Sequence, residues 1–387
     1  MEDEKKPRVI IIGGGFAGVN TAKQLEKLDK ISLILISDKK WHDYKARIFK
    51  IIEENNLSSV KIPLEELIDQ DKIILDKIKT IDLNNQQVQG ENGIYEYDYL
   101  VLATGSTPNY HGISVVEKLT YTVNSSIEAM RLLDHIEKTL QKMKDADPTE
   151  KISMGHFVVV GGGGTGVEMA AAVSTKCRRY AKEIGLDASF ITVDLFHSGS
   201  IVLENLRPAL SRAVEKRLRS LGVNIFYHRR ISKEHLQSIS IGDIHIKAST
   251  IIWTAGVEPN KLIHYQRESI DDHLRLKDHT KVYVIGDAGD DQYYGMAQTA
   301  IEHALYVSKD IKNRLSNGNT SKFIPKSVYY AVPLGSYWAA VQSEHFIITG
   351  LVGWLIRRII DLRYLIRRIP LIEVFRSFRG VPKNGYE

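Results

Sequence analysis

The sequence predicts an α/β protein with two copies of one β-α-β unit and an amphipathic C-terminal helix. Three observations support this prediction. A glycine-rich loop follows a short apolar strand near the N-terminus, the same pattern returns near residue 157, and apolar residues recur at helical spacing in a basic tail. At about 100–200 residues per domain, 387 residues fit two or three domains.

The first unit begins at residue 8. Residues 8–12 have the pattern of a buried strand, residues 13–18 read G-G-G-F-A-G, a helical spacing follows, and a second strand is expected at 31–36. In this pattern the glycines allow a tight turn and let backbone N–H groups approach a pyrophosphate at the helix N-terminus. The residues expected to bind a dinucleotide here are Gly13, Gly15, Phe16, Ala17 and Gly18.

The second unit repeats this arrangement. A strand at 157–160 leads into G-G-G-G-T-G at 161–166, a helix follows, and the next strand is expected at 190–196. One such match is weak evidence, because glycine-rich turns are common. Two matches, each between a strand and a helix, favour two Rossmann-like dinucleotide-binding domains over two purely structural turns. The expected contacts are Gly161, Gly163, Thr165 and Gly166.

Three further apolar strands end in small or acidic residues, at 97–105, 250–256 and 282–288. Ligands of open α/β sheets lie outside the carboxyl ends of the strands. An acid such as Asp287 can accept hydrogen bonds there from a sugar-alcohol chain, or it can simply form a turn. The expected contacts at these strand ends are Ala103, Thr104, Gly105, Ala255, Gly256, Gly286 and Asp287.

Composition narrows the class of protein. The single cysteine, Cys177, excludes an internal disulfide and any mechanism that needs a thiol pair. The net charge of +5 resides in the tail, where residues 345–387 hold eight basic and three acidic residues. This localisation argues against a nucleic-acid-binding body. The longest weakly polar run, 346–356, is too short to span a bilayer, which needs about 20 residues.

These motifs resemble the two-dinucleotide-binding flavoprotein superfamily. The resemblance implies FAD in the first fold, NADH or NADPH in the second, and return of Gly286-Asp287 to the ribityl chain of the flavin. Disulfide reductases and sulfide:quinone oxidoreductases of this superfamily use paired cysteines, which this chain lacks. What remains is similar to the type II, single-subunit, non-proton-pumping NADH:quinone oxidoreductases.

The resemblance also implies site residues. Glu168, directly after the second loop, would lie near the nicotinamide and the flavin, and residues 297–302 resemble the quinone-site motif A-Q-x-A-x-Q with Glu302 in place of the second Gln. We therefore expect catalytic roles for Glu168, Gln298 and Glu302, and a cofactor contact at Ala297. His42 falls in a loop that the resemblance places near the flavin, or it is an ordinary loop histidine.

Two positions depart from the family pattern. The acid expected to bind the adenosine ribose of FAD falls on Ser37, with Asp38 one position later. The equivalent position in the second fold is His197, which removes the usual acceptor for a ribose hydroxyl and leaves the choice between NADH and NADPH open.

The tail favours a membrane-interface helix at residues 351–369. On a helical wheel its apolar side chains share an arc of about 140°, and four arginines lie outside it. If this interpretation is right, truncation after Ser343 should leave a soluble, flavin-containing protein; if the helix instead packs on the body or in a dimer, truncation should damage the fold. The arc contains Trp354, Leu355, Ile359, Leu362, Ile366 and Ile369, and the arginines are Arg357, Arg363, Arg367 and Arg368.

The sequence therefore predicts a first FAD-binding part at 1–118, an NAD(P)H-binding domain at 119–256, a second FAD-binding part at 257–325 and a membrane-association region at 326–387. The predicted function is FAD-dependent NAD(P)H:quinone oxidation-reduction at the cytoplasmic side of the cell membrane. Its partners are the lipid surface and a membrane quinone, with a homodimer left open. The alternatives are a soluble ferredoxin-type reductase and a non-enzymatic, FAD-bound redox-responsive protein.

Overall fold

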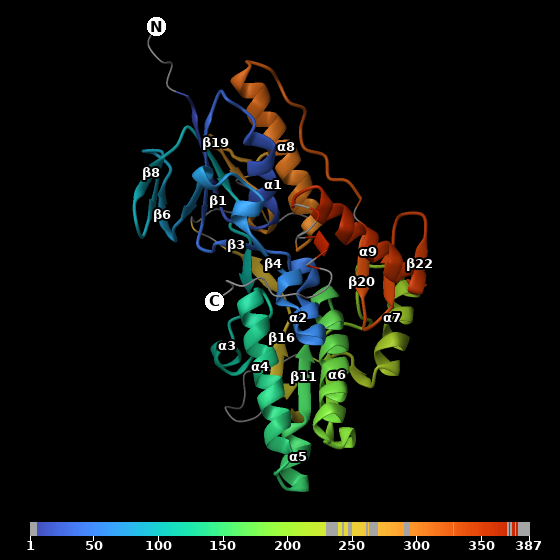
Figure 1. Ribbon diagram of the computed structural model, residues 1–387. Helices are drawn as coiled ribbons and strands as arrows, with labels where there is room; N and C mark the ends of the chain where they lie inside the picture. The colour runs from blue at the N-terminus through green and yellow to red at the C-terminus, as the bar shows by residue number, and fades with distance from the viewer. Residues whose placement is uncertain are drawn as a thin grey trace.

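The computed structural model describes residues 6–229, 239–241, 244–246, 250–260, 262, 270–289, 295–327, 329–369, 371, 374–375 and 377. Two lobes lie one above the other in Figure 1, each on its own β-sheet, and the C-terminal part of the chain lies beside their junction. The predicted α/β architecture with two β-α-β units is confirmed.

The first lobe contains a six-stranded sheet. Five neighbouring strands run parallel and β18 is antiparallel at one edge. Helices α1 (Phe16–Leu25) and α8 (Ala297–Leu315) pack against each other on one face, and a small antiparallel sheet packs on the other. In order, the large sheet is β18 (Arg275–Leu276), β19 (His279–Val284), β9 (Tyr99–Leu102), β1 (Arg8–Ile12), β2 (Ser32–Ser37) and β5 (Ile73–Leu75), and the small one is β6 (Ile78–Asp82), β7 (Gln87–Gly90) and β8 (Ile94–Glu96).

The second lobe contains a four-stranded parallel sheet. Its core includes α2 (Phe49–Glu54), which precedes this lobe in sequence but packs on α4 and α6. The strands in order are β13 (Val223–Phe226), β12 (Thr192–Phe196), β11 (His156–Val160) and β16 (Thr250–Trp253), and the other helices are α3 (Ser114–Leu119), α4 (Ser126–Met143), α5 (Pro148–Met154), α6 (Gly164–Ile184) and α7 (Pro208–Ser220).

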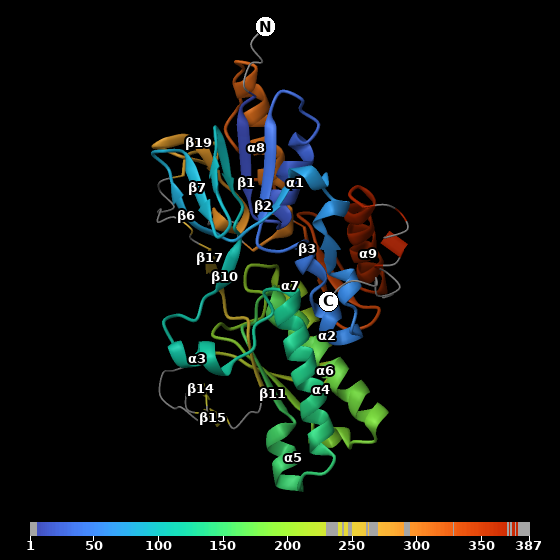
Figure 2. The same cartoon turned by 60° about the vertical axis from the view of Figure 1, so that its left-hand side comes forward.

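Two chain segments connect the lobes. Strand β10 (Ser106–Pro108) leaves the first lobe and β17 (Val257–Pro259) returns to it, and the two pair antiparallel. Figure 2 shows them side by side between the lobes. Two smaller antiparallel pairs are β3 (Trp41–Asp43) with β4 (Lys61–Pro63) and β14 (Ile239–Ile241) with β15 (Ile244–Ile246).

The C-terminal part bridges both lobes. Strands β20 (Tyr330–Pro333), β21 (Ala339–Gln342) and β22 (Ile347–Gly350) form an antiparallel sheet that leads into α9 (Leu351–Ile366). Val332 and Ala340 belong to the core of the second lobe, whereas Tyr364 and Leu365 belong to that of the first. The tail is therefore part of the folded body.

Helix α9 buries a charged pair and exposes most of its apolar side chains. Arg357 and Asp361 are 7% and 3% exposed. The amphipathic prediction is confirmed. Of the four arginines outside the apolar arc, Arg357 is buried and Arg368 half-buried, and Ile369 from the arc itself is buried as well. None of the described helices is long and apolar enough to cross a bilayer. The exposed apolar side chains are Leu351, Val352, Leu355, Ile359, Ile360, Leu362 and Ile366.

Truncation after Ser343 should destabilise the protein rather than release a soluble fragment. It removes the Asp361 carboxylate to which the fully buried Arg47 donates a hydrogen bond of 2.9 Å, and breaking a buried ion pair costs about 3–5 kcal/mol. We expect aggregation or a lowered Tm, measured by size-exclusion chromatography and circular dichroism. Ile359→Gln on the exposed face is the control and should melt like the wild type. A monodisperse fragment with the native Tm would contradict this expectation.

Candidate functional site

The first glycine-rich loop has two kinds of glycine. A Cβ at Gly13 would lie 2.3 Å from the Ala103 carbonyl oxygen, and one at Gly18 would lie 1.9 Å from the carbonyl oxygen of Gly13. These glycines are required by the packing of the chain on itself, and Gly13 also has a φ of +112°. Gly15, the N-cap of α1, is different, because a Cβ there would meet nothing within 4 Å. The free space at Gly15 suits a ligand phosphate at the helix N-terminus.

The predicted strand-end residues of the first lobe meet at this loop. A Cβ at Gly286 would lie 3.0 Å from the Cβ of Ala17. The Asp287 carboxylate accepts hydrogen bonds from Ser106 Oγ at 3.1 Å and from the Gly295 N–H at 3.0 Å. Beside it, Thr104 Oγ1 donates to the Asn260 carbonyl at 2.8 Å, and the Gly105 carbonyl accepts from the Asn260 N–H. The structure therefore brings the three first-lobe motifs together.

Ser37 and Asp38 at the end of β2 are placed differently. Ser37 is buried, and its hydroxyl donates to the Lys39 carbonyl at 2.8 Å. Asp38 is exposed and makes no hydrogen bond to any described residue. Of the two, Asp38 has the carboxylate available to a ligand.

The second loop repeats the geometry of the first. A Cβ at Gly161 would lie 2.6 Å from the Thr254 carbonyl oxygen, and one at Gly166 would lie 1.7 Å from that of Gly161. Gly163, the N-cap of α6, again has open space around its missing Cβ, and Thr165 behind it is exposed. Ala255 and Gly256 follow β16 after Thr254, with a φ of +123° at Gly256.

The His197 ring lies against the backbone of the second glycine-rich loop. Its Nδ1 accepts a hydrogen bond from the Gly162 N–H at 3.2 Å, so the ring packs against the loop backbone. The Glu204 carboxylate lies 3.9 Å from His197 Nε2 and accepts from the Ser200 N–H at 3.1 Å. An acid is therefore present beside β12, supplied by the following loop. Sequence reasoning missed it because it is displaced from the position that the family pattern specifies.

Lys45 is a second residue that sequence reasoning missed. It lies on the 3-10 turn 45–47, half-buried, and its Nζ donates to Asn124 Oδ1 at 3.0 Å. Burial lowers the pKa of Lys45, and the nearby charge of Asp287 opposes that effect. A cation thus lies near the predicted ribityl-binding acid.

Glu168 lies in the second turn of α6. It is half-buried and makes no hydrogen bond to any described residue. Burial raises the pKa of Glu168 to about 8, with Arg357 opposing and Asp361 adding to the shift. Such a carboxyl can take up and release a proton near neutral pH.

Gln298 and Glu302 are adjacent on the first turns of α8, which begins at Ala297. Gln298 Nε2 donates to Glu302 Oε1 at 3.2 Å and to the Ser327 carbonyl at 3.4 Å. Its Oε1 accepts from the Tyr329 N–H at 3.1 Å. The amide therefore braces the segment that leads to β20.

His42 is a buried structural histidine. Its Nδ1 lies 2.9 Å from the Gly14 carbonyl oxygen, and its Nε2 lies 3.3 Å from the Tyr364 hydroxyl. Burial lowers the pKa of His42 to about 4, so the ring is neutral at pH 7 and donates to Gly14. The ring supports the first loop through its hydrogen bond to Gly14.

Known proteins share this organisation. A family model described as pyridine nucleotide-disulphide oxidoreductase matches residues 7–304. The chain is 26% identical to the type II NADH:quinone oxidoreductase of Mycobacterium tuberculosis, over 94% of this chain and 85% of that protein. It is also 26% identical to the type II NADH:quinone oxidoreductase of Staphylococcus haemolyticus, over 94% of this chain and 95% of that protein.

Solved structures share the fold. The NDH2 protein of Plasmodium falciparum in complex with NADH superposes with a TM-score of 0.86 at 17% identity, covering 97% of each chain. The sulfide:quinone oxidoreductase of Aquifex aeolicus superposes with a TM-score of 0.74 at 17% identity, covering 97% of this chain and 92% of that one. The fold therefore extends over nearly the whole chain.

Gly15→Val should yield folded protein with little bound flavin. The added side chain has room within the chain but fills the space in front of α1 where a pyrophosphate would lie. Gly163→Val is the matched control, because it fills the equivalent space of the second lobe and should leave the flavin content unchanged. The measurement is the ratio of flavin to protein absorbance together with Tm. Full flavin occupancy in Gly15→Val would reject this loop as the flavin site.

Proposed function

The chain belongs to the pyridine nucleotide-disulphide oxidoreductase family, and we propose that within it the protein is a type II NADH:quinone oxidoreductase. The observation that carries the proposal is the pair of helix N-termini with open glycine positions, Gly15 and Gly163, one in each lobe. The only cysteine, Cys177, is buried in α6, and burial raises its pKa far above the ordinary value. A dithiol acceptor within the chain is therefore excluded, and both curated relatives described above carry the quinone name.

The first lobe fits FAD. Gly15 leaves room for the pyrophosphate, Asp38 would accept hydrogen bonds from the adenosine ribose, and Asp287 from the ribityl chain. Lys45 adds a positive charge beside Asp287. Bound FAD would supply a ring that accepts a hydride from the nicotinamide and passes two electrons to a quinone.

The second lobe fits NADH. Gly163 and Thr165 would receive its pyrophosphate, and Ala255 and Gly256 would line the strand end beside it. Glu168 would orient the nicotinamide or exchange a proton with the site, since its carboxyl titrates near neutral pH.

At the start of α8, Gln298 and Glu302 would shape the quinone side of the pocket. The Gln298 amide donates a hydrogen bond to the Glu302 carboxylate, and this contact orients both side chains. Glu302 stands at the position where the family pattern has a second glutamine.

The outer face of α9 fits a lipid surface at the cytoplasmic side of the cell membrane, where NADH is available. Leu355 and Ile359 are 48% and 63% exposed on this face, and an exposed apolar helix face is typical of interfacial helices. Arg363 of the same helix and Arg367, its C-cap, are exposed. Each would add about 1 kcal/mol of attraction to anionic headgroups. Membrane quinone and lipid are thus the proposed partners.

The proposed function is tested by oxidation of NADH with two acceptors, a water-soluble quinone and a long-chain quinone in anionic vesicles. Leu355→Gln/Ile359→Gln should keep the first activity and lose most of the second, because the apolar face that contacts lipid is interrupted. The matched control is Ile94→Gln/Ile152→Gln, since both of these side chains are 63% exposed and lie elsewhere. Turnover with neither quinone would reject the proposal, and equal activity of the two double variants in vesicles would reject the lipid contact.

Glu204 should favour NADH over NADPH. Its carboxylate would repel a 2′-phosphate at the end of β12, where His197 leaves no acid. Glu204→Gln should raise the NADPH-to-NADH ratio of kcat/KM by about fivefold, as expected for removing about 1 kcal/mol of repulsion from one exposed charge. Glu183→Gln, at the far end of α6, is the control. An unchanged ratio would place the ribose away from Glu204.

A further inference from the structure

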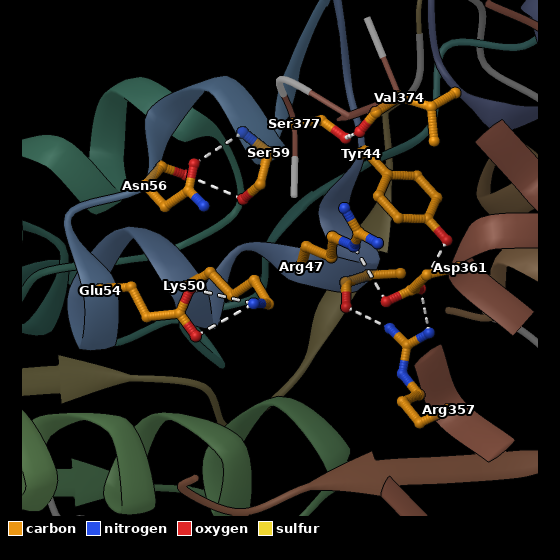
Figure 3. Close-up of polar contacts among 11 residues, drawn as sticks. Tyr44, Arg47, Lys50, Glu54, Asn56, Ser59, Arg357, Asp361, Val374 and Ser377 are labelled. Carbon is orange, nitrogen blue, oxygen red and sulfur yellow. Dashed lines mark hydrogen bonds and ion pairs between the residues drawn. The ribbon is translucent and has the colours of Figure 1, made fainter. Parts of the chain in front are cut away.

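The turn that carries Lys45 is held in place by the tail. Tyr44 OH donates to Asp361 Oδ1 at 2.8 Å, and Arg47 Nε donates to Asp361 Oδ2 at 2.9 Å. Figure 3 shows these two side chains directed to the carboxylate of Asp361. Arg357 of the same helix donates to the middle carbonyl of the turn at 2.5 Å. Helix α9 therefore fixes the segment on both sides of Lys45.

The same turn packs beside the first glycine-rich loop. The centroid of the Tyr44 ring lies 5.5 Å from that of Phe16, the first residue of α1. Phe16 directly follows Gly15, whose open space suits the pyrophosphate of FAD. The backbone N–H of Tyr44 donates to the Val60 carbonyl at 2.7 Å. Lys45 thus extends from a fixed segment next to the loop that would receive FAD.

Three hydrogen bonds connect Lys45 to Asp287. Lys45 Nζ donates to Asn124 Oδ1 at 3.0 Å, and Asn124 Nδ2 donates to the Ser106 carbonyl at 2.7 Å. Ser106 Oγ in turn donates to Asp287 Oδ2 at 3.1 Å. Asn124 is itself held, because its backbone N–H donates to Glu128 Oε2 at 2.8 Å at the start of α4. The ammonium is therefore linked through fixed groups to the acid that would bind the ribityl chain.

The charge of Lys45 is not paired directly with a carboxylate. An ammonium has three N–H donors, and among the described residues only the neutral amide oxygen of Asn124 accepts from this one. Burial lowers the pKa of Lys45, and the charges of Asp287 and Asp43 oppose that effect. Asp43 has a cation of its own, since its Oδ2 lies 3.6 Å from Lys39 Nζ. The Lys45 ammonium thus keeps two donors and its charge for a ligand.

Reduction of bound FAD would place a new negative charge in this region. Transfer of a hydride adds two electrons and one proton to the neutral ring, which leaves the reduced ring with one negative charge. The Asp287 carboxylate by itself disfavours that charge, because like charges repel. A cation linked to the same acid offsets the repulsion, and charge near the reactive ring is one of the means by which a protein tunes a flavin.

We propose that the Lys45 ammonium stabilises the reduced form of the bound flavin, and that Asn124 is the positioning residue that holds this ammonium. The inference rests on the proposed function, which places FAD in the first lobe. It also gives the tail a role in the redox chemistry, because Asp361 of α9 fixes the turn from which Lys45 extends.

The experiment measures the midpoint potential of the flavin in the holoenzyme by equilibration with a reference dye, without NADH or quinone. Lys45→Met should favour the oxidised flavin by about tenfold, which lowers the midpoint by about 30 mV for a two-electron couple. Lys45→Arg keeps the charge and should stay near the wild type. Lys138→Met is the matched control, because it removes an exposed lysine of α4 that has its own partner, Asp134.

Asn124→Leu tests the positioning role. This variant keeps the lysine but removes the acceptor that holds it, so the midpoint should fall by less than in Lys45→Met. In the Lys45→Met background the same substitution should cause no further fall, because no ammonium remains to be held. A merely structural role of the two residues predicts additive losses of bound flavin, and similar midpoints in Lys45→Met and Lys45→Arg.

A lower midpoint in Lys45→Met together with a normal one in Lys45→Arg supports the proposal. An unchanged midpoint in Lys45→Met, or equal falls in both variants, overturns it. If Lys45→Met retains no flavin, Lys45→Gln takes its place with the same criteria. The measurement is independent of quinone turnover: normal turnover without the shift rejects the role of Lys45 alone, whereas the shift without turnover rejects the proposed function alone.

Discussion

The arrangement of the tail depends on the buried hydrogen bonds that the Asp361 carboxylate accepts. It joins α9 to Tyr44 and Arg47, residues more than three hundred positions earlier in the chain. Because this contact is polar and buried, the side of α9 that carries Arg357 and Asp361 must face the body, and the side that carries Leu355 and Ile359 faces outward. The usual orientation of a surface helix is thereby reversed. The same contact holds the 44–47 segment between the glycine loop of the first lobe and the α2–α6 packing of the second.

Local backbone constraints explain how much of the site could be predicted from the sequence. Gly13 and Gly161 need a positive φ and lie against the carbonyl of a neighbouring strand end, so their identity is dictated within a few residues of the turn. The pairing of Arg357 with Asp361 and Arg47 could not be predicted in this way. A helical wheel defines two faces but does not say which faces inward. One signal was available, because Asp361 is the sole acid between Glu344 and Glu373 in an otherwise basic and apolar segment.

The two glycine loops are built alike but differ in the residues at the end of the next strand. In the first lobe Ser37 turns its hydroxyl to the backbone and Asp38 carries the exposed carboxylate. In the second lobe His197 packs under the loop and Glu204 reaches back from the following turn. In each case the acid is displaced from the position that a strict spacing rule specifies. Close packing of the backbone requires glycine at positions such as Gly13 and Gly161. A carboxylate that would bind a ribose has only to reach the ligand, so it can come from a neighbouring position.

The burial of Glu168 answers a requirement of the proposed reaction. Reduction of a quinone consumes two protons, and near an apolar surface that excludes water a carboxyl inside the protein is the suitable source. Burial raises the pKa of Glu168 to about 8, so this carboxyl can exchange a proton near neutral pH. Helix α9 serves two surfaces at once, because Asp361 ties one side of it to the core and apolar side chains such as Leu355 and Ile359 are exposed on the other.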